Sequence, residues 1–166
     1  MSYGSDYFAL ARWLRGVLVR QLWRAPPTER LPYVIRRLSD GQVVGVSTYF
    51  TAKAEHGGVE IGATFLRSDV RASFVNPKAK KLMLRHAFNA GAVRVQFTVD
   101  VRNERSQGAV AKLGAVREGV LRRDTRTWTG HMRDTVVFSI LDSEWPTVKL
   151  RLEQRLAKLA EPYAQE

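Results

Sequence analysis

Two asparagines stand where a β-strand is expected to give way to a helix. Asn76 comes directly before Pro77, and Asn103 is followed three residues later by Ser106. Asparagine and serine favour the start of a helix, and proline favours its first turn. The first backbone N–H groups of a helix lack partners and its N-terminal end is positive, so anionic oxygens bind there. Two such helix starts predict a site for a ligand that carries a diphosphate.

Cysteine and metal chemistry are not expected. The sequence has no cysteine, which excludes a thiol nucleophile, a disulfide scaffold and a zinc–cysteine module. The three histidines, His56, His86 and His131, do not have the spacing of metal ligands. We therefore expect no metal, and any catalysis must use other groups.

The chain carries a formal net charge of +11, from 27 basic and 16 acidic residues. Such a charge favours polyanions, including nucleotide cofactors, RNA, acidic proteins and anionic lipid. The sequence has no RNA-recognition or helix-turn-helix signature, so nucleic acid is unlikely to be the main partner. RNA binding with a steep salt dependence would support a nucleic-acid-associated role.

A membrane location is not expected either. Arg12, Arg15 and Arg20 interrupt the most apolar segment, and the N-terminus lacks the layout of a signal peptide. The sequence therefore predicts a cytoplasmic protein.

Hydrophobic periodicity and turn residues predict an α+β fold in one domain over residues 1–166. An N-terminal helix and linker would occupy residues 1–30, and a C-terminal helix and tail residues 142–166. Antiparallel strands at both ends and one strand–helix–strand crossover in the middle predict a mixed, mostly antiparallel sheet flanked by helices. The expected helices cover residues 5–24, 76–91, 103–114 and 143–159, and the expected strands cover residues 33–36, 43–50, 59–66, 93–99, 116–127 and 133–141.

A series of short motifs follows this order: Val59-Glu60-Ile61-Gly62, Asn76-Pro77-Lys78-Ala79-Lys80, Asn103-Glu104-Arg105-Ser106, Glu118-Gly119-Val120-Leu121-Arg122, Arg133-Asp134-Thr135 and Glu144-Trp145-Pro146. Together they resemble the RimJ/RimL-like branch of the GNAT superfamily of N-acetyltransferases, over about residues 31–156. The resemblance implies a GNAT-like sheet whose two central strands splay apart to admit acetyl-CoA. It also implies direct transfer of an acetyl group to a primary amine, either a protein N-terminus or a small amine.

The resemblance also implies which residues contact the coenzyme. Residues 71–76 match the family's Arg/Gln-x-x-Gly-x-Gly/Ala loop, although Phe74 and Asn76 occupy the two small positions. Asn103 would lie near the pantetheine arm, and Ser106 would donate a proton to the departing sulfur. The alternatives are that Asn76 merely starts a helix and that the Ser106 hydroxyl is only a cap. The implied cofactor-binding residues are Phe65, Leu66, Arg71, Ala72, Ser73, Phe74, Val75, Asn76, Asn103 and Ser106.

Two carboxylates are candidates for the base that removes the amine proton. The family often carries such a group where Glu60 stands, just before the coenzyme loop, although a solvated or salt-bridged strand glutamate is an equal alternative. A base is also expected on the strand after Glu118, where the chain has Asp124 and Thr125. Asp124 either substitutes by a small shift, or the role has moved elsewhere.

The family's usual opening strand and motif have no counterpart at the N-terminus. Because those elements help to build the acceptor site, acceptor binding could be altered, supplied by a second copy in a homodimer, or lost. The alternative function is therefore a catalytically weak or inactive GNAT-fold protein that binds CoA or a partner.

Overall fold

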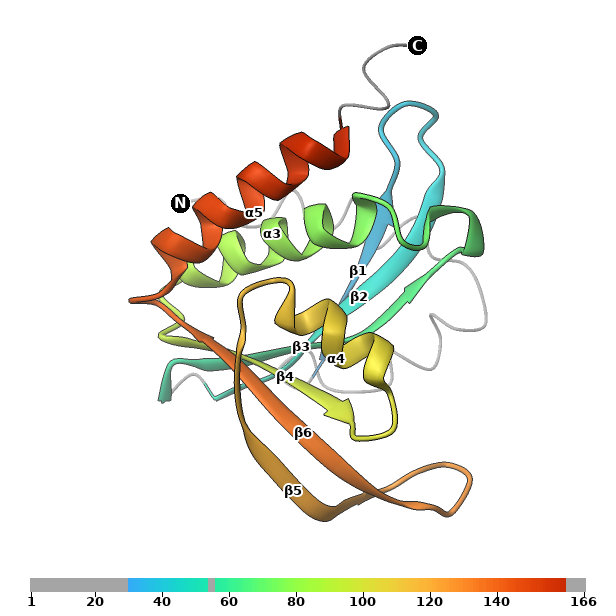
Figure 1. Cartoon of the computed structure of the whole chain (residues 1–166), viewed down its shortest axis with the longest axis vertical. Helices are drawn as coiled ribbons and strands as arrows, with labels where there is room; N and C mark the ends of the chain where they lie inside the picture. The colour runs from blue at the N-terminus through green and yellow to red at the C-terminus, as the bar shows by residue number, and fades with distance from the viewer. Residues whose placement is uncertain (1–29, 54–55, 161–166) are drawn as a thin grey trace.

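The structure is a computed structural model that describes residues 30–53 and 56–160 (Figure 1). The helix expected over residues 5–24 lies outside these residues. In chain order the strands are β1 (Arg30–Arg36), β2 (Val43–Lys53), β3 (Gly58–Leu66), β4 (Arg94–Asp100), β5 (Val116–Arg126) and β6 (Met132–Leu141). The helices are the 3-10 turn η2 (Ser68–Val70), α3 (Val75–Asn89), α4 (Glu104–Ala111) and α5 (Trp145–Ala160).

The six strands form one sheet in the order β1-β2-β3-β4-β6-β5. Only the β3–β4 pair in this sheet is parallel, and the other four pairs are antiparallel. The expected hairpins join β1 to β2 and β5 to β6. At the first turn the Asp40 side chain accepts a hydrogen bond from the Gln42 N–H, and Gly41 takes a φ of 68°.

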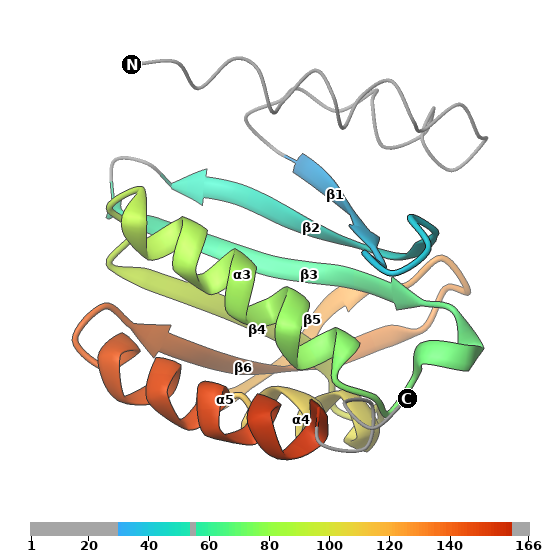
Figure 2. The same cartoon turned by 90° about the horizontal axis from the view of Figure 1, so that it is seen from above.

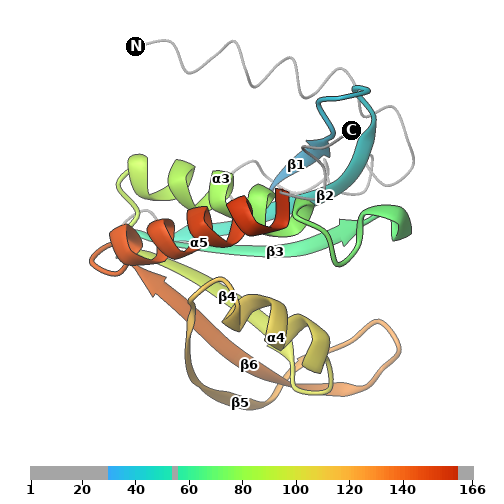
Figure 3. The ribbon, with the colours of Figure 1, turned by 45° about the horizontal axis from the view of Figure 1, so that its top comes forward.

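The two central strands separate after a short shared ladder. They pair at only three positions, Gly58–Arg94, Val59–Val95 and Glu60–Gln96. Beyond these pairs β3 continues to Leu66 and β4 to Asp100 without a ladder between them, and Figure 3 shows them diverging. This region, bounded by residues 61–66 and 97–100, is called the split below. The expectation of splayed central strands is confirmed.

A bulge bends β3 beside the split. Between the pairs Thr48–Gly62 and Val46–Phe65, two residues of β3 oppose one residue of β2. Ala63, inside this bulge, has a φ of 43°, which non-glycine residues adopt only at a cost. Bulges increase strand twist, so this one helps to turn β3 away from β4.

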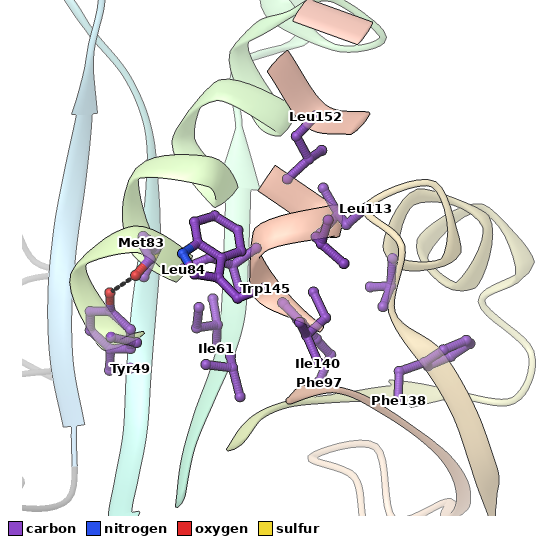
Figure 4. Close-up of a cluster of buried hydrophobic side chains, with 14 of the residues drawn as sticks. Tyr49, Ile61, Met83, Leu84, Phe97, Leu113, Phe138, Ile140, Trp145 and Leu152 are labelled. Atoms are coloured by element: carbon purple, nitrogen blue, oxygen red, sulfur yellow. Dashed lines mark hydrogen bonds between the residues drawn. The ribbon is translucent and has the colours of Figure 1, made fainter. Parts of the chain in front are cut away.

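All three α-helices cover one face of the sheet, called the helix face below (Figures 1 and 3). The core beneath them includes Ile61, Leu84, Ile140 and Leu152, each no more than 1% exposed. The Tyr49 hydroxyl donates to the Met83 carbonyl at 2.6 Å within the same core (Figure 4). α3 and α5 lie side by side (Figure 2), and the Lys81 ammonium group contacts the Glu153 carboxylate at 2.7 Å.

Two helix starts differ from the expected ones. α3 begins at Val75, with Phe74 before it, so Asn76 is already the second helical residue and does not cap the helix. The first helical residue, Val75, instead donates its N–H to the Ser73 hydroxyl oxygen at 3.2 Å. α5 begins at Trp145 and not at Ser143, because residues 142–144 form a turn in which the Trp145 N–H donates to the Asp142 carbonyl.

Candidate active site

The split connects two chemically different faces of the sheet. On β4, Val95, Phe97 and Val99 point into the core under the helices. Side chains alternate along a strand, so Gln96, Thr98 and Asp100 lie on the opposite face. That face also carries Glu60, Glu118 and Asp124, which contact side chains of this set or their neighbours on β6. We call it the carboxylate face.

The loop between β3 and α3 is held by local hydrogen bonds. The Arg71 Nε donates to the Leu66 carbonyl at 3.1 Å, which anchors an otherwise exposed guanidinium group near the start of α3. The Ser73 hydroxyl donates to the Val70 carbonyl at 2.7 Å. Ala72 takes the left-handed conformation, with a φ of 60°, whereas Phe74 has a φ of −69°. The family has small residues where this chain has Phe74 and Asn76. The residue with the left-handed backbone is Ala72 instead.

Other residues of the expected coenzyme site have separate surroundings. Val75 is buried in a small cluster with Val44 and Val70, against which Leu66 and Phe74 pack. Phe65 is 65% exposed. Leu66 and Val75 thus serve the core, while the Phe65 side chain is accessible at the end of β3.

Asn76 contains a buried atom that needs a partner. Its Oδ1 is shielded from solvent and makes no hydrogen bond within the described part of the chain. Buried polar atoms are usually satisfied, and an exception points to a missing ligand or water. Because this atom is an acceptor in the first turn of α3, it fits a water or a ligand N–H or O–H group at the helix start.

The start of α4 follows the expected pattern. Asn103 caps the helix, because its Oδ1 accepts a hydrogen bond from the Ser106 N–H at 3.0 Å. The Ser106 hydroxyl is half-buried and makes no hydrogen bond among the described residues. The cap is therefore Asn103, and the Ser106 hydroxyl remains available.

Glu60 stands at the last paired position before the split. Its carboxylate accepts hydrogen bonds from Thr98 Oγ1 at 2.6 Å and from Gln96 Nε2 at 3.4 Å. In residues 30–53 and 56–160, no cationic side chain lies within ion-pair distance of Glu60. Glu60 is therefore a half-buried carboxylate with neutral partners only, which excludes the salt-bridge alternative within this part of the chain.

Asp124 has a different environment. Its Oδ2 accepts from the hydroxyls of Thr135 at 2.8 Å and Thr125 at 2.9 Å and lies 3.9 Å from the Arg133 guanidinium. The Thr135 hydroxyl, with these other partners, lowers the pKa of Asp124. Strands β4 and β6 stand between the strand of Asp124 and that of Glu60. The structure thus does not bring the two candidate bases together.

The remaining carboxylates of this face are paired with arginines. Glu118 accepts from Arg94 at 2.6 Å and from the Ser139 hydroxyl at 2.7 Å, and the Arg94 hydrogen bond is the main cause that lowers the pKa of Glu118 to about 2. Asp100 accepts from the Arg102 guanidinium at 2.8 Å, which lowers its pKa to about 2.

Sequence reasoning missed Lys80, which is 5% exposed on the helix face. Its ammonium group donates to Thr64 Oγ1 at 2.6 Å and to Ser47 Oγ at 2.9 Å. The sequence carries a signal, because Lys80 lies four residues before Leu84 and therefore on the apolar stripe of the helix. Because the apolar stripe packs against the sheet, a lysine within it is buried with its apolar neighbours.

The described residues offer neither a metal cluster nor a membrane span. No group of three or more acidic or histidine side chains among them is placed to hold a metal ion. None of the described helices is long and apolar enough to cross a membrane.

Comparisons with known proteins agree with this geometry. The family model of the acetyltransferase (GNAT) domain matches residues 5–116. A crystal structure of a candidate acetyltransferase from T. thermophilus is 47% identical, with a TM-score of 0.75, over 83% of this chain and 71% of that chain. Mycobacterium smegmatis RimJ, solved in complex with CoA-disulfide, is 26% identical, with a TM-score of 0.71, over 83% of this chain and 66% of that chain. No curated protein matches the sequence.

Proposed function

Because this chain belongs to the GNAT family of acetyltransferases and is an N-acetyltransferase, we propose that it uses acetyl-CoA to acetylate a primary amine approaching from the carboxylate face. The observation that carries the proposal is the split, which opens beside Glu60 and has the start of α4 on its other side. A coenzyme that enters the split would contact side chains of both the helix face and the carboxylate face.

The start of α3 and its loop would hold the diphosphate of the coenzyme. Arg71 supplies a guanidinium group anchored through its Nε, and the helix supplies N–H groups and a positive end. The unsatisfied Asn76 Oδ1 is an acceptor, so it would not bind the phosphate oxygens themselves but fits a donor beside them, such as a bound water or an N–H or O–H group of the coenzyme. Asn103, which already caps α4, would lie beside the pantetheine arm.

Acetyl-CoA supplies the thioester acetyl group when it is bound. The acceptor amine must lose a proton before or during attack, and a positioned carboxylate can take it, directly or through one water. Glu60 fits this role because Thr98 and Gln96 fix its orientation while no arginine in the described part of the chain neutralises it. Asp124 fits less well, because two hydroxyls already use its Oδ2 and lower its pKa.

Ser106 would return a proton to the leaving thiolate. The hydroxyl lies in the first turn of α4, where the positive end of the helix dipole favours negative charge. Its freedom from the capping interaction supports this role over the alternative of a simple cap.

The carboxylate face favours a cationic acceptor. Four carboxylates lie on this face of a chain whose net charge is +11, and Glu60 is the one without an arginine partner in the described structure. Both a protein N-terminus and a small amine carry the positive charge that the Glu60 carboxylate would attract.

Two measurements on the intact chain test the proposal. Calorimetry with acetyl-CoA should show 1:1 binding. Release of free thiol should then depend on an added amine, tested with N-terminal peptides and small polyamines. Absence of binding by folded protein would overturn the proposal.

A second candidate is a CoA-binding protein with little or no activity. The observation that favours it is the loop, where Phe74 and Asn76 stand at the two positions that the family reserves for small residues. Coenzyme binding without thiol release from any amine in the panel would support this candidate and contradict the first.

A further inference from the structure

Lys80 crosses the split on the helix face. Its ammonium group donates to Thr64 of β3, four residues beyond the last paired residue of that strand. The same nitrogen lies 6.0 Å from the centre of the ring of Phe97, the first residue of β4 beyond its ladder with β3. Lys80 therefore lies beside both strands where no ladder joins them.

The partners of this lysine are all neutral. The Ser47 and Thr64 hydroxyls accept two of its hydrogen bonds and are themselves 2.9 Å apart. An ammonium group has three donors, so one donor is left without a hydrogen-bond acceptor among the described residues, and the nitrogen lies over the Phe97 ring. An ionised group buried without a counter-charge is expensive, so burial alone lowers the pKa of Lys80 to about 7.

Among residues 30–53 and 56–160, no nearby charge explains or offsets this shift. The elements packed against Lys80 contribute Ser47 and Tyr49 from β2, Thr64 from β3 and Phe97 from β4. Burial raises the pKa of Tyr49, so this phenol is neutral. The next lysine on α3, Lys81, points away to Glu153 of α5. The coenzyme-free site therefore holds an amine that is poised to accept a proton.

We propose that Lys80 is a coenzyme-contacting residue that takes up a proton when acetyl-CoA enters the split. This inference rests on the proposed function. The coenzyme arm would bring carbonyl oxygens that can accept the third hydrogen bond, and its phosphates would bring negative charge to the adjacent start of α3. Both changes favour the ammonium form of Lys80 over the neutral amine.

The direction of the pH dependence follows from linkage. A ligand that favours the protonated form binds more weakly as the pH rises above the pKa of the free site. Coenzyme affinity should therefore fall through the range above pH 7 until the pKa of the complex is reached. Below pH 7 Lys80 is already charged in the free protein and makes no such contribution.

Calorimetry at pH 8, in two buffers of different ionisation enthalpy, measures the proton directly. Acetyl-CoA suits this test because its thiol is capped and its phosphate monoester, with a second pKa near 6, is already ionised. We expect the wild type to take up roughly 0.9 proton per coenzyme bound, because a group with a pKa of about 7 is mostly neutral at pH 8. Lys80→Met should abolish this uptake, whereas the control Lys81→Met should retain it.

Lys80→Met should fold, because it replaces a buried amine by an apolar side chain of similar length and leaves the Ser47–Thr64 hydrogen bond in place. A titration of ¹³Cε-labelled lysines by NMR needs no variant. One resonance with a midpoint near pH 7 should move to a higher midpoint with acetyl-CoA bound. Binding of acetyl-CoA without proton uptake, or an unmoved midpoint, would overturn this inference alone. Absence of binding would overturn the proposed function as well.

Discussion

On the helix face of the split, the buried amine of Lys80 lies against two hydroxyls, whereas the opposite face carries four carboxylates. Among these carboxylates, Glu118 and Asp100 are paired with arginines, and Asp124 is held by threonine hydroxyls near Arg133. Glu60 has neutral partners only. Each face thus has one ionisable group beside the split that lacks an opposite charge within the described residues.

This contrast distinguishes charged groups that are paired within the fold from ionisable groups whose charge a ligand can still affect. An arginine beside a carboxylate fixes the ionisation state of both groups and leaves little for a ligand to change. Glu60 and Lys80 lack such partners, so an incoming positive or negative charge would alter their energy the most. The groups that a ligand can affect are therefore identified by the absence of a charged partner, more than by the presence of a carboxylate or an amine.

Removing the carboxylate at Glu60 should have the largest effect. Glu60→Gln keeps the shape and can still accept the short hydrogen bond from Thr98 Oγ1, but it loses the weaker acceptor contact with Gln96 Nε2 and cannot accept the amine proton. We expect kcat to fall by about 10²–10⁴-fold, the usual contribution of general acid–base catalysis, with the Kd of acetyl-CoA unchanged. Steady-state thiol release and calorimetry measure the two quantities.

Asp124→Asn is the matched control, because it makes the same chemical change on a strand that β4 and β6 separate from β3. Its kcat should stay within about threefold of the wild type, since its carboxylate serves hydroxyls of the sheet and not the split. Equal losses in both variants would contradict the comparison between the two carboxylates.

Lys80→Met should change how stability depends on pH. The pKa of Lys80 is about 7 in the folded protein and 10.5 when exposed, so the unfolded chain binds more protons between these values. The free energy of unfolding of the wild type should therefore rise across this range relative to the variant. We expect the difference to change by about 2 kcal/mol between pH 7 and pH 9, measured by urea unfolding. A constant difference would mean that Lys80 is charged in the folded protein.

Ser106→Ala should reduce kcat by about tenfold and leave the affinity for acetyl-CoA within about twofold. Helix capping should survive, because Asn103 accepts from the backbone N–H of residue 106 and not from its hydroxyl. An unaltered melting temperature would confirm that point. If turnover were also unaltered, Ser106 would be an ordinary helix residue.

Glu118→Gln should have the smallest effect. The pKa of Glu118 is lowered to about 2 from 4.5, so its contribution to stability is present above pH 4.5 and lost as the pH falls towards 2. The pair with Arg94 is about one-third exposed, so solvent screening limits the contribution to about 1 kcal/mol or less. Urea unfolding of both proteins should show a difference at pH 7 that shrinks on acidification.

Local sequence signals predicted the elements well, because strands, turns and caps are encoded by neighbouring residues. The Asp40–Gly41 turn and the Asn103 cap both depend on residues within three positions of each other. The same signals placed the cap of α3 two residues late, at Asn76 instead of Phe74, and Ser73 binds the first helical N–H. The implied roles of Ser106, Glu60 and Asp124 stay predictions, and so does the homodimer offered as one way to complete the acceptor site.

The ionisable groups without a charged partner, Glu60 and Lys80, could not be identified from the local sequence pattern. Glu60 and Asp124 look alike in the sequence, and only the pairing of β5 with β6 shows that Asp124 is already used by Thr135. Lys80 is buried because Ser47 and Thr64, 33 and 16 residues away, meet it across the sheet. The strained φ angles of Ala63 and Ala72 likewise depend on the bulge and loop that surround them.

The ladder of three pairs between β3 and β4 also has a mechanical meaning. It acts as a hinge between two three-stranded leaves, each of which is joined internally by long antiparallel ladders. α3 contacts both β3 and β4, so it braces the two leaves against each other on one side. A change in the angle between them would leave most hydrogen bonds of the sheet intact, so the core under the helices, which includes Ile61 of one leaf and Phe97 of the other, is what fixes the width of the gap.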